Sequence, residues 1–373
     1  PTQDLMDAAV QEGLQRLEDQ VRSDKVMVAF VAEFSRGKSE LINAIFFADY
    51  GRRIMPASAG RTTMCPTELG YDANVAPSLR LLPIETRLQM QSLAEWRVKA
   101  DRWHEIPLDV GNADQIAKAL EKVAEVRKVS LDNARALGFW HDDLTDENPV
   151  PDAQGMVEVP MWRHAIINIP HPLLKQGLVI LDTPGLNAVG AEPELTVNLI
   201  PQAHAVVFIL SADTGVTRSD LSIWREHLAI SPERVEARLV VLNKIDTLWD
   251  TLNTAEQVQS QMERQCATSA EMLGVSLDRV VPVSAQKGLV AKITADDVLL
   301  ETSGLPALEE ALAKGIMGRR QSILRAAVAT GVASLRTETS RVINIRRRDL
   351  DDQMAELRSL RGKNASVIES MRH

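Results

Sequence analysis

The sequence has few cysteines and no long apolar stretch, and both absences restrict what the protein can be. Only two of its 373 residues are cysteines. Cys65 and Cys266 lie far apart with no metal-ligand spacing around them, so reduced thiols in a cytosolic protein are expected rather than a disulfide framework. No segment approaches the roughly 18 consecutive apolar residues that a membrane-spanning helix needs. The first residues lack a basic region followed by an apolar run, so no secretory signal is predicted.

An excess of basic charge is also lacking. The chain has 42 Lys and Arg against 51 Asp and Glu, which gives a formal net charge of -9. This balance argues against a protein whose whole surface binds nucleic acid or anionic lipid, and no nucleic-acid partner is predicted. With 45% hydrophobic and 25% charged residues, the composition is that of a globular protein with one large domain plus appended helices, or with two domains.

Short apolar runs recur along the chain and alternate with helical patterns. The run from Lys25 to Ala32 is rich in β-branched residues and bounded by charge, which is typical of a buried strand. Similar runs occupy residues 178–181, 205–210, 238–242 and 280–283, with helical patterns such as 220–228 and 255–273 among them. Strands that alternate with helices imply right-handed crossovers, so the sequence predicts an α/β fold with a doubly wound, mainly parallel sheet.

The region from about 83 to 155 interrupts this alternation because it contains no buried-strand pattern. Asn112 begins a capping-box pattern that opens one helix. Ser130 is placed to cap another helix, which Gly138 would stop. Residues 156–169 then alternate like a strand that leads back to the sheet. Residues 83–155 are therefore predicted to be a mostly helical insertion.

Both ends of the chain carry helical periodicity. Residues 3–22 place apolar side chains at mostly three-to-five-residue steps, which is typical of an amphipathic helix. A second pattern runs from Gln321 to about Met371, and a helix this long needs a partner, for which the N-terminal helix is the obvious candidate. The sequence thus predicts a neck helix at 1–23, an α/β domain at 24–317 and a long neck or stalk helix at 318–373.

The strand that ends near Ala32 leads into a loop and then a helical pattern, which is the setting of a phosphate-binding loop. Backbone N–H groups at the helix N-terminus face the phosphate oxygens, and the helix dipole favours their charge. Lys38 would supply a point charge to the β- and γ-phosphates, and the Ser39 hydroxyl would ligate Mg²⁺. Alanine replaces the usual glycine at Ala32, which we expect to be tolerated. The predicted phosphate-binding residues are Phe34, Ser35, Arg36, Gly37, Lys38 and Ser39.

A second motif, Asp182-Thr183-Pro184-Gly185, also follows an apolar run. Asp182 at the strand end can hold Mg²⁺ through water, and the Gly185 N–H can meet the γ-phosphate and so sense its loss on hydrolysis. Taken alone, the motif is equally compatible with a Pro-Gly turn after a strand.

Two further motifs predict recognition of guanine. Asn243-Lys244-Ile245-Asp246 follows the run at 238–242. A carboxylate at Asp246 can accept hydrogen bonds from the guanine N1–H and N2–H₂, whereas adenine lacks this donor pair and would leave the carboxylate unpaired. The Lys244 stem would pack along the base. Ser284, Ala285 and Lys287, after the last predicted strand, would close over it.

Each of these four motifs follows the carboxyl end of a predicted strand, and those ends meet at one edge of the sheet. One ligand site along that edge is therefore strongly favoured over four unrelated loops. The constellation resembles the GTPase superfamily, and its details resemble the dynamin-like branch, especially bacterial dynamin-like proteins. The resemblance rests on AEFSRGKSELINAI at 32–45, Met55-Pro56 with RTTMCPT at 61–67, ILSAD at 209–213 and NKIDTLWD at 243–250. It covers about residues 1–82 and 156–373 and leaves out the insertion.

The resemblance implies roles for individual residues. Thr63 is expected to be the switch threonine that ligates Mg²⁺ and orients water, with Thr62 as its rival. Ser35 should lie near the bridging phosphate oxygen, so Ser35, Lys38 and Thr63 are the predicted catalytic residues. Phe34 stands where eukaryotic dynamins have a water-positioning glutamine, and its side chain cannot bond water, so backbone or other groups must hold the water.

Two arginine features allow two readings each. Small residues are usual at the position of Arg36. Its charge would either stabilise phosphates, as an arginine finger does, or be solvated at the tip of the loop. The solvated arginine is the favoured interpretation. Arg346-Arg347-Arg348 would either meet lipid headgroups or form a solvated helix face answered by Asp349 and Asp351, and again the solvated face is favoured.

Taken together, the motifs and the resemblance predict a cytoplasmic GTPase, peripheral to a membrane in one reading, that hydrolyses GTP to GDP and phosphate with Mg²⁺. Its expected partners are a second copy through nucleotide-bound heads, and lipid contacted through parts outside this chain or through another protein. The family implies coupling of head dimerisation to neck movement and membrane remodelling. The alternatives are a GTP-dependent regulatory switch, and an assembly protein with little turnover and no direct membrane action.

Overall fold

The computed structural model describes most of the chain and divides it into two compact units. The described residues are 10, 11, 13, 14, 17, 18, 21, 24–56, 65–89, 91, 93–142, 148–183, 200, 203–228, 237–249 and 254–371. One unit comprises Lys25–Ile323, and the other combines Pro1–Asp24 with Leu324–His373.

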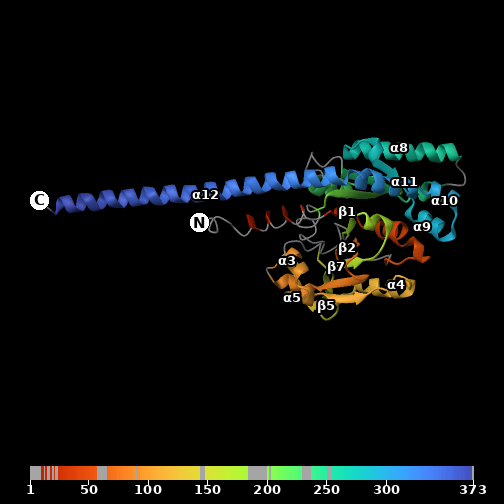
Figure 1. Ribbon diagram of the computed structural model, residues 1–373, viewed down its shortest axis with the longest axis horizontal. Helices are drawn as coiled ribbons and strands as arrows, with labels where there is room; N and C mark the ends of the chain where they lie inside the picture. Colours follow the sequence, from red (N-terminus) through yellow and green to blue (C-terminus); the bar gives the residue numbers. More distant parts are fainter. Residues whose placement is uncertain are drawn as a thin grey trace. The chain divides into compact units, whose positions relative to one another are not determined.

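A nine-stranded mixed sheet forms the centre of the larger unit (Figure 1), with the order β11-β10-β9-β1-β8-β2-β7-β3-β4. The strands from β11 to β8 are parallel to their neighbours. Beyond β8, the strand β2 is antiparallel to β8 and parallel to β7, whereas β3 is antiparallel to both β7 and β4. The predicted mainly parallel α/β sheet is confirmed, with a mixed extension on one side. The strands of the described residues are Val26–Ala32 (β1), Thr67–Gly70 (β2), Ser78–Pro83 (β3), His104–Pro107 (β4), Val126–Ser130 (β5), Met156–Pro160 (β6), Trp162–Asn168 (β7), Leu178–Asp182 (β8), Ala205–Ser211 (β9), Arg238–Asn243 (β10) and Val280–Pro282 (β11).

The central strands are apolar because both of their faces are covered. Every residue of β8 and β10 is buried, and in β1 only Met27 is partly exposed. A strand without a solvent face needs no polar alternation, which is why these segments appear in the sequence as continuous apolar runs.

Helices connect and cover the strands, and local signals set several of their ends. The Thr254 hydroxyl accepts a hydrogen bond from the Gln257 N–H at the start of α8, and Gly274 ends that helix in a left-handed conformation (φ 64°). The α-helices are Lys38–Ile42 (α2), Leu93–Val98 (α3), Ala113–Glu121 (α4), Leu131–Ala136 (α5), Pro172–Lys175 (α6), Arg218–Ile223 (α7), Ala255–Leu273 (α8), Ala285–Thr294 (α9), Asp297–Thr302 (α10), Leu305–Glu310 (α11) and Arg320–Ser370 (α12). The turns Asn43–Phe47, Trp224–Leu228 and Ala311–Ile316 continue α2, α7 and α11 as π-helix.

The insertion contains two strands that the sequence did not predict. No residue of β4 is buried, and Val129 is the one buried residue of β5, so neither strand has a buried-strand pattern. β4 forms the edge of the large sheet, and β5 pairs with β6 in a separate two-stranded sheet. The predicted caps are confirmed: Asn112 accepts a hydrogen bond from the Gln115 N–H, and Ser130 caps α5. In Figure 1, α4 and α5 lie on the opposite side of this unit from α8.

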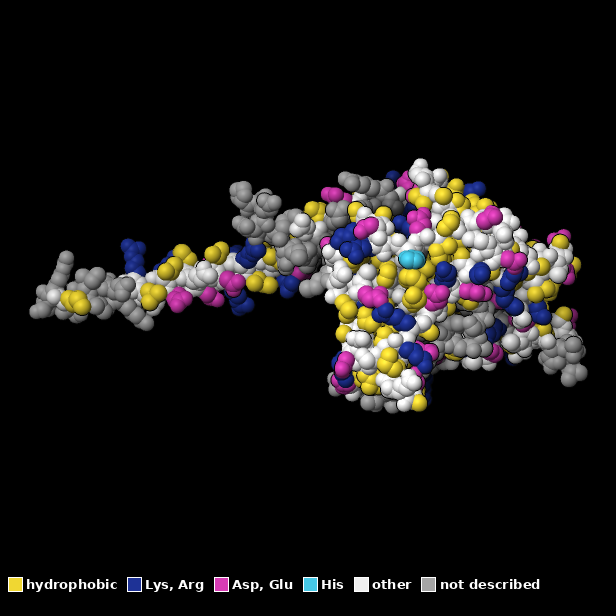
Figure 2. Space-filling model, turned by 90° about the horizontal axis from the view of Figure 1, so that it is seen from below, with side chains coloured by type: hydrophobic (Ala, Val, Ile, Leu, Met, Phe, Trp, Pro, Cys, Tyr) yellow, Lys and Arg dark blue, Asp and Glu magenta, His cyan; other side chains and the backbone are white. Residues whose placement is uncertain are grey.

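The smaller unit pairs the N-terminal helical segment with α12. A Cβ atom on Gly13 would lie 3.1 Å from Leu335 Cδ1, so the two helices are in contact, as predicted. α12 runs for 51 residues without interruption. Leu350, Met354 and Leu357 are exposed on it, and Figure 2 shows apolar side chains between charged ones along this helix.

The basic run in α12 is solvent-exposed. Arg346, Arg347 and Arg348 are all exposed, and Arg347 Nε lies 4.0 Å from Asp351 Oδ2. This arrangement agrees with the solvated helix face favoured from the sequence. Among the described helices, none has an 18-residue stretch apolar enough to cross a membrane.

Candidate functional site

The loop after β1 turns through two left-handed residues before α2 begins. Ser35 has φ 65° and Gly37 has φ 84°. The Leu41 N–H donates to the Gly37 carbonyl oxygen at 3.0 Å, so the helix starts directly after Gly37. Ala32 belongs to β1, where the extended backbone requires no glycine. The structure therefore has the strand–loop–helix arrangement that the sequence predicts for phosphate binding.

Lys38 and Asp182 meet at the base of this loop. Lys38 Nζ lies 2.5 Å from Asp182 Oδ1, and the two side chains are 10% and 2% exposed. The two groups form a buried ion pair, and within the described residues the second carboxylate oxygen, Asp182 Oδ2, is buried without a hydrogen-bond partner. Buried polar atoms in this state are rare in folded proteins, and a cation and a carboxylate side by side suit an anionic ligand with its counter-ion.

Asn243, at the end of β10, connects three loops. Its Nδ2 donates to the Arg36 carbonyl oxygen at 2.9 Å, and its Oδ1 accepts from the Ala285 N–H at 3.0 Å. A Cβ atom on Gly37 would lie 2.4 Å from Asn243 Nδ2, so glycine is required there by contact as well as by its φ. The asparagine thus holds the phosphate loop against the two loops predicted to bind the base.

The predicted base-binding residues are brought together beside this contact. The Ser284 hydroxyl donates to Asp246 Oδ1 at 2.5 Å and accepts from the Lys287 N–H at 3.2 Å. Lys244 has a left-handed backbone (φ 60°), and its Nζ lies 3.3 Å from Asp213 Oδ2. Burial acts to raise the pKa of Asp213, but the Ser211 hydroxyl and the Lys244 ammonium hold that pKa below its ordinary value. These contacts bring Asp246, Ser284 and Lys287 together next to the loop that Asn243 joins to the phosphate loop.

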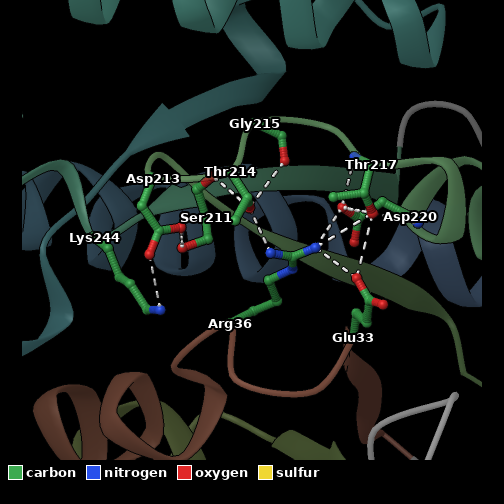
Figure 3. A network of polar contacts seen from close by, with 9 residues as sticks. All are labelled: Glu33, Arg36, Ser211, Asp213, Thr214, Gly215, Thr217, Asp220 and Lys244. Carbon is green, nitrogen blue, oxygen red and sulfur yellow. Dashed lines mark hydrogen bonds and ion pairs between the residues drawn. The ribbon is translucent and has the colours of Figure 1, made fainter. Parts of the chain in front are cut away.

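The structure corrects the favoured reading of Arg36. The residue is 7% exposed, so its side chain is not solvated at a loop tip. Its guanidinium bonds Glu33 and Asp220 rather than pointing into solvent, as Figure 3 shows. Phe34, by contrast, is 47% exposed.

Three residues with predicted switch roles lie in segments outside the described residues. Thr62 and Thr63 fall within 57–64, and Gly185 falls within 184–199, and both segments lie outside the described residues. Their roles as switch residues stay predictions.

The partners of Arg36 were not identified from the sequence. Glu33 precedes the phosphate loop, and Thr214, Thr217 and Asp220 follow β9. Thr217 and Asp220 do carry a local signal, because they form a capping box at the start of α7. That signal predicts the helix start but not the contact with Arg36.

The chain matches a family model and several known proteins in sequence. The family model described as Dynamin family matches residues 28–245, which include the phosphate loop and most of the Asn243 motif. The bacterial dynamin-like protein of Nostoc punctiforme is 22% identical over 160 residues, covering 40% of this chain and 23% of the relative. Transmembrane GTPase Marf of Drosophila melanogaster is 26% identical over 322 residues, covering 84% of this chain and 31% of the relative.

One similar solved structure is an oligomerised bacterial dynamin pair, described as a mechanism for the long-range sensing and tethering of membranes. The TM-score is 0.48 at 16% identity, covering 98% of this chain and 49% of that one. The chain thus spans less than half of the length of each of these proteins. Because the family model matches more than half of its residues, the chain belongs to the dynamin family of GTPases.

Proposed function

We propose that this chain binds GTP in the presence of Mg²⁺ and hydrolyses it to GDP and phosphate. The single observation that supports this best is the Asn243 contact, because it ties the Lys38 loop to the loops of Asp246 and Ser284. A nucleotide lying along this edge would have its phosphates at one end of the contact and its base at the other.

Guanine selectivity would come from Asp246. The Ser284 hydroxyl bonds one of its oxygens and so orients the carboxylate. Guanine presents two N–H donors to such a group, whereas adenine would leave a carboxylate unpaired at the base, and a site built this way can discriminate by orders of magnitude. The Lys244 stem would lie along the base, with its ammonium held by Asp213.

Ser39, Asp182 and Lys38 suit a magnesium-bound triphosphate. One oxygen of the buried Asp182 carboxylate pairs with Lys38, and the other lacks a hydrogen-bond partner among the described residues. Hydroxyl and carboxylate oxygens are the ligands that this hard cation prefers. Ser39 would ligate the ion directly and Asp182 through water, with Thr63 as the third predicted ligand. When bound, Mg²⁺ neutralises charge on the phosphate oxygens.

Hydrolysis by this chain would depend on positioning and charge. Lys38 would hold the β- and γ-phosphates, and Ser35 would lie near the oxygen that bridges them. Water attacks the γ-phosphorus as the bond to the bridging oxygen breaks. The bonding electron pair stays on the β-phosphate of GDP, and the proton from the water leaves with the released phosphate. The Phe34 side chain cannot bond this water, so Thr63 or backbone groups would orient it. Loss of the γ-phosphate would release Thr63 and Gly185.

We further propose that GTP-bound heads pair with each other and that hydrolysis moves the neck helices, with membrane remodelling as the outcome. Membership of the dynamin family supports this proposal. The helical unit of Pro1–Asp24 and Leu324–His373 is compact in itself, which suits a neck. Lipid contact would involve parts outside this chain or a partner protein, and the protein would act in the cytoplasm, at the membrane when assembled.

Nucleotide turnover tests the proposed reaction. The intact protein should release phosphate from GTP in the presence of Mg²⁺ but not from ATP, and Lys38→Ala should abolish turnover. If the folded wild-type protein neither binds nor cleaves GTP, the proposed function is wrong.

Protein concentration tests the proposed head pairing. The single-turnover rate per molecule should rise with concentration if heads complete each other's sites. A slow rate that does not change with concentration would instead favour the regulatory switch or the assembly protein. Co-sedimentation of the full-length protein with liposomes separates these alternatives from membrane action.

A further inference from the structure

The segment after β9 forms a turn that is stabilised by its own hydrogen bonds. The Gly215 N–H donates to the Ser211 carbonyl oxygen at 2.9 Å, and the Ser211 hydroxyl donates to Asp213 Oδ1 at 2.6 Å. The Thr217 N–H and hydroxyl both donate to Asp220 Oδ2, at 3.0 and 2.8 Å, which joins the turn to the start of α7. Figure 3 shows this turn lying over the phosphate loop.

Arg36 reaches from the phosphate loop into this turn. Its Nη1 donates to Thr214 Oγ1 at 2.5 Å, and its Nη2 donates to Asp220 Oδ2 at 2.9 Å and to Glu33 Oε2 at 2.5 Å. Asp220 is fully buried, and the Glu33 side chain is 22% exposed. The guanidinium therefore bridges two loops that are separated by about 180 residues in the sequence.

The positive charge of Arg36 is already paired with carboxylates within this network. One guanidinium faces two carboxylates at short distance, so little of its positive charge remains for a phosphate group. An arginine finger must instead present an unpaired guanidinium to the transferring phosphoryl group. The contribution of Arg36 is therefore to hold the backbone in place.

The backbone around Arg36 needs such support. Ser35 and Gly37 on either side of it are left-handed, and that conformation is unfavourable for a residue with a side chain such as Ser35. The Arg36 carbonyl oxygen accepts from Asn243 while the side chain is bound by the turn after β9. The residue is thus anchored at both its backbone and its side chain, between two neighbours with left-handed backbones.

We propose that Arg36 is a positioning residue that acts through Asp220 to keep the phosphate loop in its nucleotide-binding conformation. The inference rests on the proposed nucleotide site and concerns the contact between the Arg36 and Asp220 side chains. Because the loop would hold the phosphates of GDP and GTP alike, loss of the contact weakens both nucleotides together. A finger would behave differently, since its loss lowers kcat and leaves GDP affinity intact.

The test measures GDP affinity by calorimetry, KM and kcat for GTP, and the melting temperature without nucleotide. Arg36→Ala and Asp220→Ala should each raise the Kd of GDP by about 10- to 100-fold, the range expected for loss of a charged hydrogen bond. KM for GTP should rise in parallel, whereas kcat at saturation should change less. Arg36→Lys should restore part of the affinity, because lysine keeps the charge but cannot bridge several partners at once.

The double variant Arg36→Ala/Asp220→Ala distinguishes a coupled pair from two separate effects. Its Kd should be no higher than that of the worse single variant. Arg163→Ala is the matched control. Arg163 is also 7% exposed and donates to the Thr86 carbonyl oxygen, and it belongs to β7, which is three strands away from β1 in the sheet. It should lower the melting temperature without changing the Kd of GDP.

Unchanged GDP affinity in folded Arg36→Lys and Asp220→Ala proteins would overturn the inference, as would a fall in kcat alone. The proposed function fails separately: a wild-type protein that does not bind GDP would refute the nucleotide site and this inference together. Wild-type binding with unaffected variants would refute the inference only.

Discussion

The side-chain amide of Asn243 donates a hydrogen bond of 2.9 Å to the carbonyl oxygen of Arg36, a residue 207 positions earlier in the chain. Asn243 is 1% exposed, and its amide oxygen is bonded at the same time to the Ala285 N–H. One side chain therefore fixes the distance between the loop predicted to hold phosphates and the loops predicted to hold the base.

Replacing Asn243, itself a predicted nucleotide-binding residue, by aspartate should weaken nucleotide binding through the loss of its hydrogen bond to Arg36. The carboxylate can still accept from Ala285 but cannot donate to Arg36, so two acceptors would face each other in a buried place. We expect the Kd of GDP to rise by about 10-fold or more, measured by calorimetry. Asn168→Asp is the control, because Asn168 is 8% exposed and donates to the Val75 carbonyl oxygen in a remote part of the sheet. An equal effect of both variants on GDP affinity would contradict this account.

Gly37 should tolerate alanine less well than Gly51 does. Both glycines are left-handed, with φ 84° and 69°, so alanine at either position costs roughly 1–2 kcal/mol of folding free energy. At Gly37 the added methyl group would also lie 2.4 Å from Asn243 Nδ2, whereas nothing lies within 4 Å at Gly51. Gly37→Ala should therefore reduce GDP affinity at least about 10-fold, and Gly51→Ala should change only the free energy of unfolding. Equal GDP affinity in the two variants would show that the close contact with Asn243 does not matter.

A buried ion pair near the insertion should make stability depend on pH. Glu68 in β2 is 4% exposed and contacts Arg97 of α3 and, at 2.9 Å, His164 Nε2. Burial acts to raise the pKa of Glu68, but Arg97 and His164 lower it from 4.5 to about 2. Because the pKa is lower in the folded protein, the stabilisation is complete above the unfolded value and is lost as the pH falls from about 5 towards 2.

Glu68→Gln should remove this stabilisation at neutral pH. The lowered pKa corresponds to about 3 kcal/mol as an upper value, since the Arg97 side chain is 40% exposed and water screens its charge. Urea unfolding should show the wild type more stable than the variant at pH 7, with a difference that shrinks between pH 5 and pH 3. Glu105→Gln on the exposed strand β4 should change little at any pH. A difference between wild type and Glu68→Gln that stays constant with pH would contradict the role of the charge.

Those parts of the fold were predicted that leave a recognisable pattern in the local sequence. The strands β1, β8, β9 and β10 are buried on both faces and so appear as apolar runs, and α8 carries its own cap and stop residues. The strands β4 and β5 were missed because they are largely exposed, and sheet pairing rather than burial defines them. A strand was recognised where burial on both faces leaves a continuous apolar run in the sequence, and β2 and β3, which are short or interrupted by Arg80, were not predicted either.

Some features of the candidate site could likewise be predicted from the sequence and others could not. Lys38 and Asp246 were predicted to share a site because the carboxyl ends of parallel strands meet at one sheet edge. The burial of Arg36 could not be predicted, because it depends on how the turn after β9 folds back to place Asp220, 184 positions away, beside it. No local spacing encodes that contact.

The most direct test of the account is the base preference of Asp246→Asn. The amide can donate to the 2-oxo group of xanthine but no longer accepts both guanine donors, while Ser284 can still bond its oxygen. Wild-type protein should bind GDP far more tightly than XDP, and the variant should prefer XDP, with the ratio of the two dissociation constants shifted by at least about 100-fold. A folded variant that keeps the wild-type preference for GDP would show that Asp246 does not contact the base and would contradict the proposed site.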